Sequence, residues 1–193
     1  MIKLKILTLN QTRITDFAAA RNKLMSSAQA AWLMFLDCDE KLSVAIDPTK
    51  LDKRFNYSFK RLDWFLGKKL RFGETASIRL VRLVQPQTGQ WQGKVHEKFI
   101  SRLPVRLLAP PILHQRRLSI SDFLDRLNYY STLRSSELNH FSIFELLFYP
   151  PVKFVKNYFW HLGFLDGLPG LAMAFFMSLH SFAVRVKQYE KMA

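Results

Sequence analysis

A short apolar run that ends in acidic residues constrains this chain more than any other stretch. Residues 31–40 read AWLMFLDCDE, and residues 32–36 contain no polar position. An unbroken apolar run of this length is typical of a strand that is buried on both faces of a parallel sheet. Asp37, Asp39 and Glu40 follow at once, so the sequence predicts acidic side chains at the end of a central strand.

Acidic residues at a strand end can hold a cation, or they can form a solvated turn. In open α/β sheets, ligands bind beyond the carboxyl ends of the strands. Mg²⁺ usually takes one or two carboxylates and completes its shell with water and substrate phosphates. Asp37 and Asp39 can supply those carboxylates. The alternative is an acidic loop or a helix N-cap, because a bare D-x-D pattern often occurs by chance.

The segments around this strand predict an α/β unit. Residues 2–9 alternate in the manner of a strand near a sheet edge. Asp16 is expected to cap a helix over residues 17–30, whose apolar positions recur at helical spacing. Strand, helix and strand in this order form a βαβ unit with parallel strands. Residues 77–84 predict a further strand, whereas residues 55–66 fit strand and loop equally.

Two histidines lie where a site can use them. His96 and Glu97 close the stretch GKVHE after a glycine-containing turn. An imidazole beside a carboxylate can serve as a general base or as a metal ligand. Two side chains that face water at a strand end are the alternative. His114 follows a break expected at residues 109–111, and it can either complete a metal shell or have a structural role.

Charge and composition indicate an anionic surface as partner. The chain has 29 Lys and Arg against 15 Asp and Glu, a net charge of +14, together with 17 Phe. A protein that lies on a bilayer needs both basic and aromatic residues. No helix-turn-helix, RNP-type or zinc-finger pattern supports nucleic-acid binding. Cys38, the single cysteine, excludes an internal disulfide and is expected to be a small buried side chain.

The last third of the chain predicts helices with a membrane character. A helix is expected over residues 119–137, then an aromatic-rich helix from Phe141 that is broken at Pro150-Pro151. The apolar run 171–184 has fourteen residues, too few to span about 30 Å of hydrocarbon. With Trp, Tyr and Lys anchors nearby, an interfacial or re-entrant hairpin is expected. A buried core hairpin or a protein–protein interface is the alternative.

Taken in order, these segments resemble the family 2 glycosyltransferases, specifically the bacterial lipopolysaccharide-core type. The matching segments are DFAAARN at 16–22, residues 32–40, GKVHE at 93–97 with Trp91, NYYS at 128–131, and residues 157–170, which end in GFLDGLPG. The resemblance implies an α/β fold with a partial GT-A domain over residues 1–118. This domain is a Rossmann-like mixed sheet with flanking helices. A helical, membrane-associating region over residues 119–193 would follow it.

The resemblance also implies an activity. It is metal-dependent, inverting transfer of a sugar from a nucleotide-diphosphate sugar to a glycan or glycolipid acceptor of the lipopolysaccharide core. Asp37 and Asp39 match the motif that binds Mg²⁺ or Mn²⁺ and the diphosphate, and His114 is a further candidate ligand. The location implied is cytoplasmic and peripheral to the inner membrane, since residues 1–10 lack the apolar core of a signal peptide.

Roles for other residues follow from the same resemblance. Arg21 and Asn22 match the helix start that faces the donor, and Glu97, beside His96, matches the base that deprotonates the acceptor hydroxyl. Members of this family begin with a strand and loop that seat the nucleotide base, whereas this chain begins at what would be the third strand. A fragment, a split gene or an inactive remnant is therefore expected. The alternative function is a non-enzymatic basic protein that binds a membrane surface.

Overall fold

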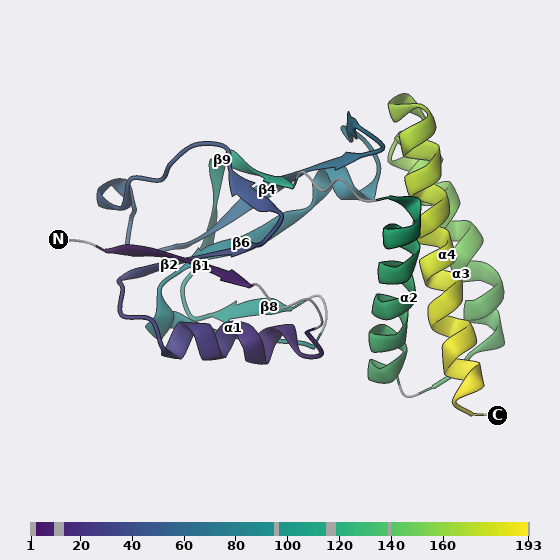
Figure 1. Ribbon diagram of the computed structural model, residues 1–193, viewed down its shortest axis with the longest axis horizontal. Helices are drawn as coiled ribbons and strands as arrows, with labels where there is room; N and C mark the ends of the chain where they lie inside the picture. Colours follow the sequence, from purple (N-terminus) through teal and green to yellow (C-terminus); the bar gives the residue numbers. More distant parts are fainter. Residues whose placement is uncertain (1–2, 10–13, 95–96, 115–118, 139, 193) are drawn as a thin grey trace. The chain divides into compact units, whose positions relative to one another are not determined.

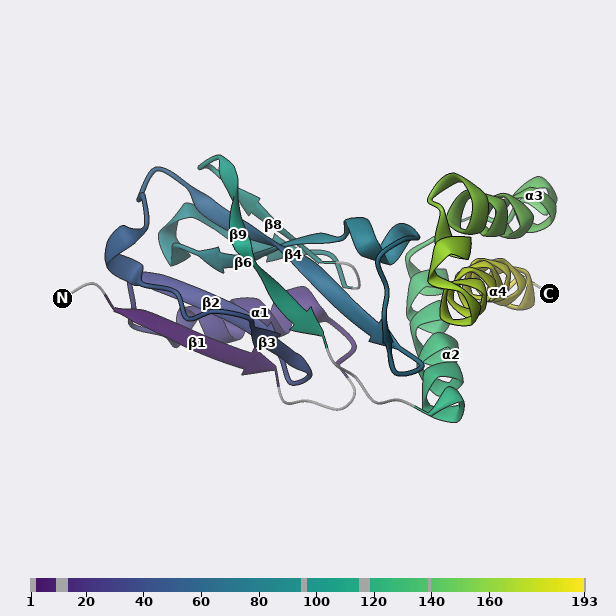
Figure 2. The same ribbon diagram turned by 90° about the horizontal axis from the view of Figure 1, so that it is seen from above.

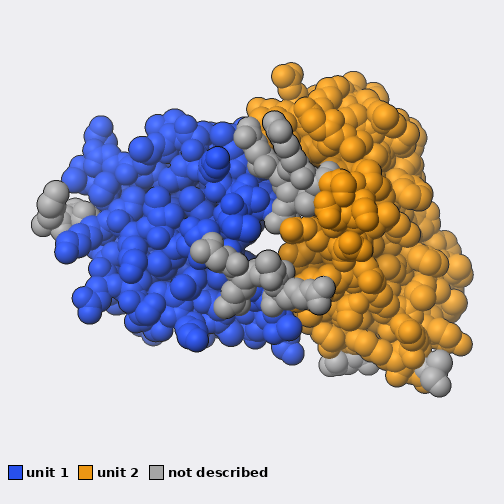
Figure 3. All heavy atoms as spheres, viewed as in Figure 1, with its two compact units in different colours: residues 1–62, 78–115 blue, residues 63–77, 116–193 orange. Residues whose placement is uncertain are grey.

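The chain forms two compact units. The computed structural model describes residues 3–9, 14–94, 97–114, 119–138 and 140–192. Figure 3 colours the two units, which consist of residues 1–62 with 78–115 and of residues 63–77 with 116–193. The division at 115/116 lies close to the one expected at 118/119. Residues 63–77 pack with the C-terminal unit, which the sequence did not indicate.

A mixed sheet forms the frame of the first unit (Figure 1). Strand β1 (Leu4–Leu9) lies at the sheet edge and pairs in parallel with β2 (Trp32–Asp37), with Leu9 opposite Asp37. Among the described residues the strand order is β1-β2-β6-β4-β9-β3. The β2–β6, β4–β6 and β3–β9 pairs are antiparallel. The other strands are β3 (Glu40–Leu42), β4 (Asn56–Phe65), β6 (Arg79–Val84) and β9 (Val105–His114).

The predicted βαβ unit and the α/β class with a mixed sheet are confirmed. Helix α1 (Phe17–Ser26) begins after Asp16, whose Oδ1 accepts a hydrogen bond from the Ala19 amide at 2.8 Å, as the capping prediction requires. The helix ends earlier than expected. The hydroxyls of Ser26 and Ser27 donate to the carbonyls of Lys23 and Leu24, and serine side chains that compete in this way favour helix ends.

Strand β2 is buried on both faces, as predicted. Leu33 and Phe35 point toward α1 and the hairpin of β7 (Gly89–Gln92) and β8 (Lys98–Ser101), where they join a core with Trp91. Trp32, Met34 and Leu36 belong to a second core on the other face, together with Tyr57, Phe59, Leu83 and Ile112. The end of β2 is therefore held from both sides, which fixes where its acidic residues lie.

The break expected at residues 109–111 is wrong. Strand β9 runs from Val105 to His114 without interruption (Figure 2). Proline removes a donor from a strand, but its fixed φ is compatible with extended backbone. The carbonyl of Pro111 still accepts a hydrogen bond from the Ser43 amide at 3.2 Å. The continuous strand places His114 opposite Glu40.

Three helices build the second unit. They are α2 (Ile120–Glu137), α3 (Ile143–Val155) and α4 (Leu168–Glu190), and α4 packs against both others. A capping box of Ser119 and Asp122 starts α2. A π-helical turn (Lys156–Trp160) and a 3₁₀ turn (Gly163–Asp166) join α3 to α4. The remaining short elements are β5 (Lys68–Lys69), which pairs with the end of β4, and 3₁₀ turns at Pro48–Lys50, Glu74–Ser77 and Pro86–Thr88.

The helix break expected at Pro150-Pro151 is also wrong, because α3 continues through both prolines. Each proline removes one N–H donor from the helix. Packing on α4 offsets this loss: Pro150 is buried, and its carbonyl accepts a hydrogen bond from the Ser178 hydroxyl at 2.7 Å.

The second helix of the predicted hairpin, α4, is longer than the fourteen-residue apolar run at 171–184. Helix α4 has 23 residues, and by length and composition it is long and apolar enough to cross a membrane.

The turn between α3 and α4 is fixed by the segment GFLDGLPG. The buried Asp166 carboxylate accepts hydrogen bonds from the amides of Arg71 and Phe72, both at 2.9 Å. Gly170 lies so close to Gly163 that an added Cβ would be 1.9 Å from the Gly163 carbonyl oxygen. This segment therefore closes a tight helical turn onto residues 63–77.

Candidate functional site

The acidic residues lie in a tight turn between β2 and β3. Asp37 is the last residue of β2 and Glu40 is the first residue of β3. The Asp37 backbone amide donates to Oε2 of Glu40 at 3.1 Å, which holds the Glu40 side chain against the end of β2. Cys38 is exposed in this turn, so the prediction of a small buried side chain is wrong. Asp37 lies opposite Leu9, and both are the last residues of their parallel strands. Ligands of α/β proteins bind beyond the carboxyl ends of such strands.

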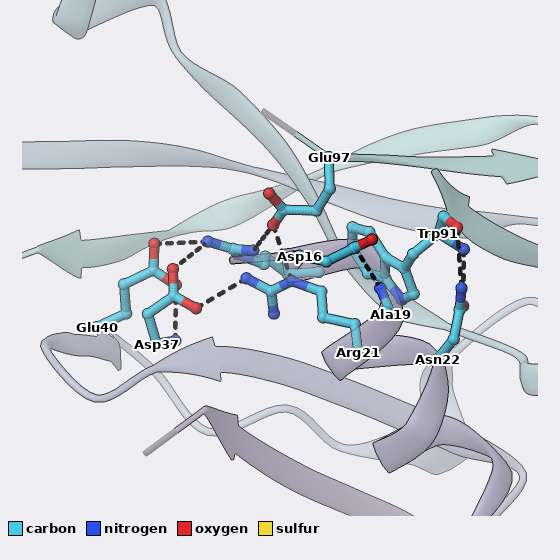
Figure 4. Close-up of polar contacts among 9 residues, drawn as sticks. Asp16, Ala19, Arg21, Asn22, Asp37, Glu40, Trp91 and Glu97 are labelled. Carbon is cyan, nitrogen blue, oxygen red and sulfur yellow. Dashed lines mark hydrogen bonds and ion pairs between the residues drawn. The ribbon is translucent and has the colours of Figure 1, made fainter. Parts of the chain in front are cut away.

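Two arginines hold the Asp37 carboxylate (Figure 4). Nη2 of Arg21, from α1, donates to Oδ1 at 2.7 Å, and Nη2 of Arg82, from β6, donates to Oδ2 at 2.9 Å. The same Arg82 nitrogen donates to Oε1 of Glu40, also at 2.9 Å. Glu40 has no exposed side-chain surface, and the Arg82 side chain is 5% exposed. Because buried charges are costly unless paired, these contacts fix the end of β2.

Glu97 joins the same network from the segment that leads into β8. Its Oε1 accepts a hydrogen bond from Nε of Arg21 at 2.8 Å and lies 3.8 Å from Nη1 of Arg82. Both of these contacts are made through Oε1. The predicted base and the predicted donor-binding residues Arg21 and Asp37 are thus brought together. The structure shows this proximity, whereas their chemical roles stay predictions.

The cluster contains three carboxylates and two guanidinium groups. Burial opposes ionisation of Asp37, but the positive charges of Arg82 and Arg21 outweigh it and hold the pKa of Asp37 below its ordinary value. Burial likewise opposes the charge of Arg82, yet Glu40 and Asp37 raise the pKa of Arg82 above its ordinary value. Both groups are therefore charged at neutral pH.

The lowered pKa of Asp37 predicts how stability depends on pH. A carboxyl group whose folded pKa lies below its unfolded pKa stabilises the folded state at higher pH, and this contribution is lost as pH falls through the folded pKa. We expect Asp37→Asn to be less stable than the wild type at pH 7, with a difference that shrinks below about pH 4. Urea unfolding of both proteins between pH 7 and pH 2 measures this. A difference that stays constant over that range would contradict it.

Asp39 and His114 form a second, smaller group. Nε2 of His114 lies 3.3 Å from Oδ2 of Asp39, and both side chains are largely buried. No group of three or more His, Cys, Asp or Glu residues within the described ranges could hold a metal ion by itself. One carboxylate and one imidazole fit Mn²⁺, and a carboxylate fits Mg²⁺, when a ligand's phosphate oxygens complete the shell. Asp37 is already engaged by two arginines, so Asp39 and His114 are the better candidate ligands.

The two remaining predicted residues are Asn22 and His96. The Asn22 amide exchanges two hydrogen bonds of 2.9 Å with the backbone of Trp91, so it ties α1 to β7. The neighbouring Arg21 guanidinium carbon lies 5.0 Å from the centroid of the Trp91 ring. Stacking on Trp91 and bonds to two carboxylates orient this guanidinium. His96 lies outside the described residues.

Sequence reasoning missed the roles of Arg82 and Glu40. Glu40 belongs to the acidic run that follows the apolar strand, and Arg82 is one of two arginines within the strand predicted at residues 77–84. The local signal was weak, because Arg79 on the same strand is exposed whereas Arg82 is buried. Arg82 and Glu40 are 42 positions apart, so only the folded sheet shows that they form a pair.

The first unit is thus an α/β unit with an acidic cluster at the carboxyl end of a parallel strand pair. No protein-family model matches the chain. The chain is similar to the lipopolysaccharide core biosynthesis glycosyltransferase LpsC of Rhizobium meliloti (strain 1021). The two are 24% identical over 190 residues, which cover 92% of this chain and 70% of LpsC.

Proposed function

We propose that this chain is a glycosyltransferase of lipopolysaccharide core biosynthesis. The observation that carries the proposal is the cluster of Asp37, Arg21 and Glu97 at the end of β2. The similarity to LpsC, which covers 92% of the chain, supports the proposal. The first unit then corresponds to part of a GT-A domain of the family 2 type. Its ligands are a nucleotide-diphosphate sugar and a glycan or glycolipid acceptor.

The arginines are suited to the diphosphate of the donor. Nη1 of Arg21 and Nε of Arg82 are buried and have no hydrogen-bond acceptor among the described residues. A buried donor without an acceptor costs free energy that a ligand oxygen can recover. Guanidinium groups bind phosphate oxygens well because their N–H groups form a planar fork. Arg21 would therefore orient the donor while it keeps its bonds to Asp37 and Glu97.

Asp39 and His114 would hold Mg²⁺ or Mn²⁺. When bound, such a cation neutralises negative charge that develops on a leaving diphosphate. Asp37 would act differently: its two oxygens fix Arg21 and Arg82 in place, and thereby set where the phosphate-binding groups lie.

Glu97 would deprotonate the acceptor hydroxyl. Its Oε1 is held by Arg21, so Oε2 is the atom that accepts the proton. Loss of the proton allows the acceptor oxygen to form a bond to the anomeric carbon while the bond from that carbon to the diphosphate breaks and the nucleotide diphosphate leaves. Because this displacement has a single step, it inverts the configuration at that carbon and forms no covalent enzyme intermediate. His96 directly precedes Glu97 in the sequence.

A membrane-held acceptor fits the second unit. Helix α4 is long and apolar enough for membrane association, and α3 exposes large apolar side chains. The protein would then work at the cytoplasmic face of the inner membrane as a peripheral protein. The apolar surface equally favours a second function, that of a non-enzymatic protein that binds anionic membranes.

Titration of the protein with nucleotide-diphosphate sugars separates the two functions. We expect binding by calorimetry that requires Mn²⁺ or Mg²⁺, and that weakens by at least tenfold in Asp39→Asn. The exposed Asp47→Asn is the matched control and should bind as the wild type does. If the wild-type protein binds no donor with metal present, while it still binds anionic vesicles, the non-enzymatic function is supported instead.

A further inference from the structure

The outer side of α3 carries a continuous apolar stripe. Apart from one adjacent pair, successive members are three or four residues apart, which places them on one face of the helix and the turn that follows. We call them the outer stripe: Phe144, Leu147, Phe148, Val152, Val155 and Phe159, all exposed. Phe144 is 71% exposed, and Trp160, next to the last member, is 82% exposed. Soluble monomers rarely expose apolar patches of this extent.

An open groove beside the outer stripe extends this surface toward α4. It is lined by Pro150, Pro151, Phe154, Val155, Phe175 and Ser178. Five of these six side chains are apolar, so the groove fits acyl chains better than a polar ligand. The α4 residues Leu168, Leu171 and Phe175 are exposed as well. The apolar surface thus spans both helices of the hairpin.

Several ionisable side chains near this surface have partners. Glu145 lies 3.5 Å from Arg185, and Lys153 lies 2.6 Å from Glu74. The Asp166 carboxylate in the connecting turn accepts two backbone hydrogen bonds. Pairing lowers the cost of bringing charges close to hydrocarbon. Lys156, which begins the π-helical turn, is exposed, and a lysine there can reach lipid headgroups.

Contacts between α4 and α2 argue against a membrane-spanning α4. The Lys187 ammonium donates to the Asn128 carbonyl at 2.7 Å, to the Ser131 hydroxyl at 2.8 Å and to the Thr132 hydroxyl at 2.7 Å. Helix α2 also exposes Asp122 and Asp125. If α4 crossed the bilayer, it would either break these bonds in hydrocarbon or carry a charged helix with it, and both are costly.

We propose that the second unit lies in the plane of an anionic membrane. The outer stripe and Trp160 enter the interface, the groove takes up acyl chains, and α2 stays in water. An amphipathic surface of this kind binds through its apolar area together with basic residues that attract anionic lipid. The net charge of +14 favours anionic lipid over zwitterionic lipid. This inference rests on the proposed membrane-held acceptor, and vesicle binding without donor sugar tests it separately from sugar transfer.

Single cysteine labels test this orientation. Cys38→Ser removes the only native cysteine, and an environment-sensitive fluorophore is then attached through Phe148→Cys, Trp160→Cys, Asp125→Cys or Met192→Cys. Vesicles contain phosphatidylcholine with or without phosphatidylglycerol. With phosphatidylglycerol, we expect blue-shifted emission and loss of access to an aqueous quencher at 148 and 160. Labels at 125 and 192 should stay accessible to a quencher added outside.

Two results would overturn the proposal. A label at 192 that an external quencher cannot reach would show that α4 crosses the bilayer. Failure to bind anionic vesicles, together with a dimer in sedimentation, would show that a second copy of the chain covers the outer stripe.

We also expect Lys156→Gln to weaken partitioning onto these vesicles about fivefold. Lys50→Gln, an exposed lysine of the first unit, is the control and should leave partitioning unchanged.

Discussion

Glu97→Gln is expected to reduce the turnover number for sugar transfer by about 10²–10⁴-fold, the usual contribution of a positioned general base. Glutamine keeps the shape of the side chain, and its carbonyl oxygen can still accept the Arg21 Nε–H that Glu97 accepts at 2.8 Å. It cannot take up the proton of the acceptor hydroxyl. The Michaelis constant for the donor should change little, because the variant leaves the arginines in place.

Steady-state kinetics with donor and acceptor varied separately give this result, and circular dichroism confirms that the variant is folded. Glu190→Gln, at the exposed end of α4, is the matched control and should turn over like the wild type. Wild-type turnover in Glu97→Gln would remove Glu97 from the mechanism. A loss that appears only in the Michaelis constant would assign Glu97 to binding instead.

Arg82→Met is expected to destabilise the protein by about 3–5 kcal/mol, the cost of breaking a buried ion pair by removing one partner. Methionine fills most of the space but leaves the Glu40 carboxylate, which has no exposed surface, without its cation. Asp37 loses one of its two guanidinium contacts at the same time. Urea unfolding of both proteins measures the difference. Arg79→Met, an exposed position on the same strand, should change stability by no more than about 0.5 kcal/mol.

A double variant distinguishes the charge pair from simple packing. Arg82→Met combined with Glu40→Leu removes both buried charges, and it should recover part of the stability that Arg82→Met loses. If the double variant loses more free energy of unfolding than the two single variants lose together, the Arg82–Glu40 pair does not stabilise the fold in the way we describe. A cost for Arg82→Met no larger than that for Arg79→Met would contradict the account directly.

The strand with its acidic end could be predicted from sequence because its signals are local. The apolar run of β2 is unbroken. The Asp16 carboxylate, which caps α1, bonds the amide of Ala19, only three positions later. Parallel pairing of β1 with β2 follows from the helix between them. The proximity of Asp37 and Arg21 follows in turn, because a βαβ unit brings the strand end close to its helix.

Other features depend on contacts between distant segments. Arg82 reaches Asp37 from β6, and Glu97 reaches Arg21 from the segment before β8. No periodicity in the sequence shows which arginine of β6 faces inward. The sequence shows the local cost of the prolines in α3 and β9, so they look like breaks. It does not show the packing of α3 on α4 or the pairing of β9 with β3, which offset this cost. Residues 63–77 join the helical unit through Asp166, a contact across 94 positions.

The assignment as a transferase is tested by transfer of a labelled sugar from nucleotide-diphosphate sugars to a lipopolysaccharide core acceptor in the presence of Mn²⁺. Nuclear magnetic resonance of the product reads the anomeric configuration. We predict that the wild-type protein forms a glycosidic bond whose configuration is inverted relative to the donor, and that Glu97→Gln forms almost none. Retained configuration would contradict the direct displacement. No product from any donor, with a folded protein and metal present, would contradict the assignment as a transferase.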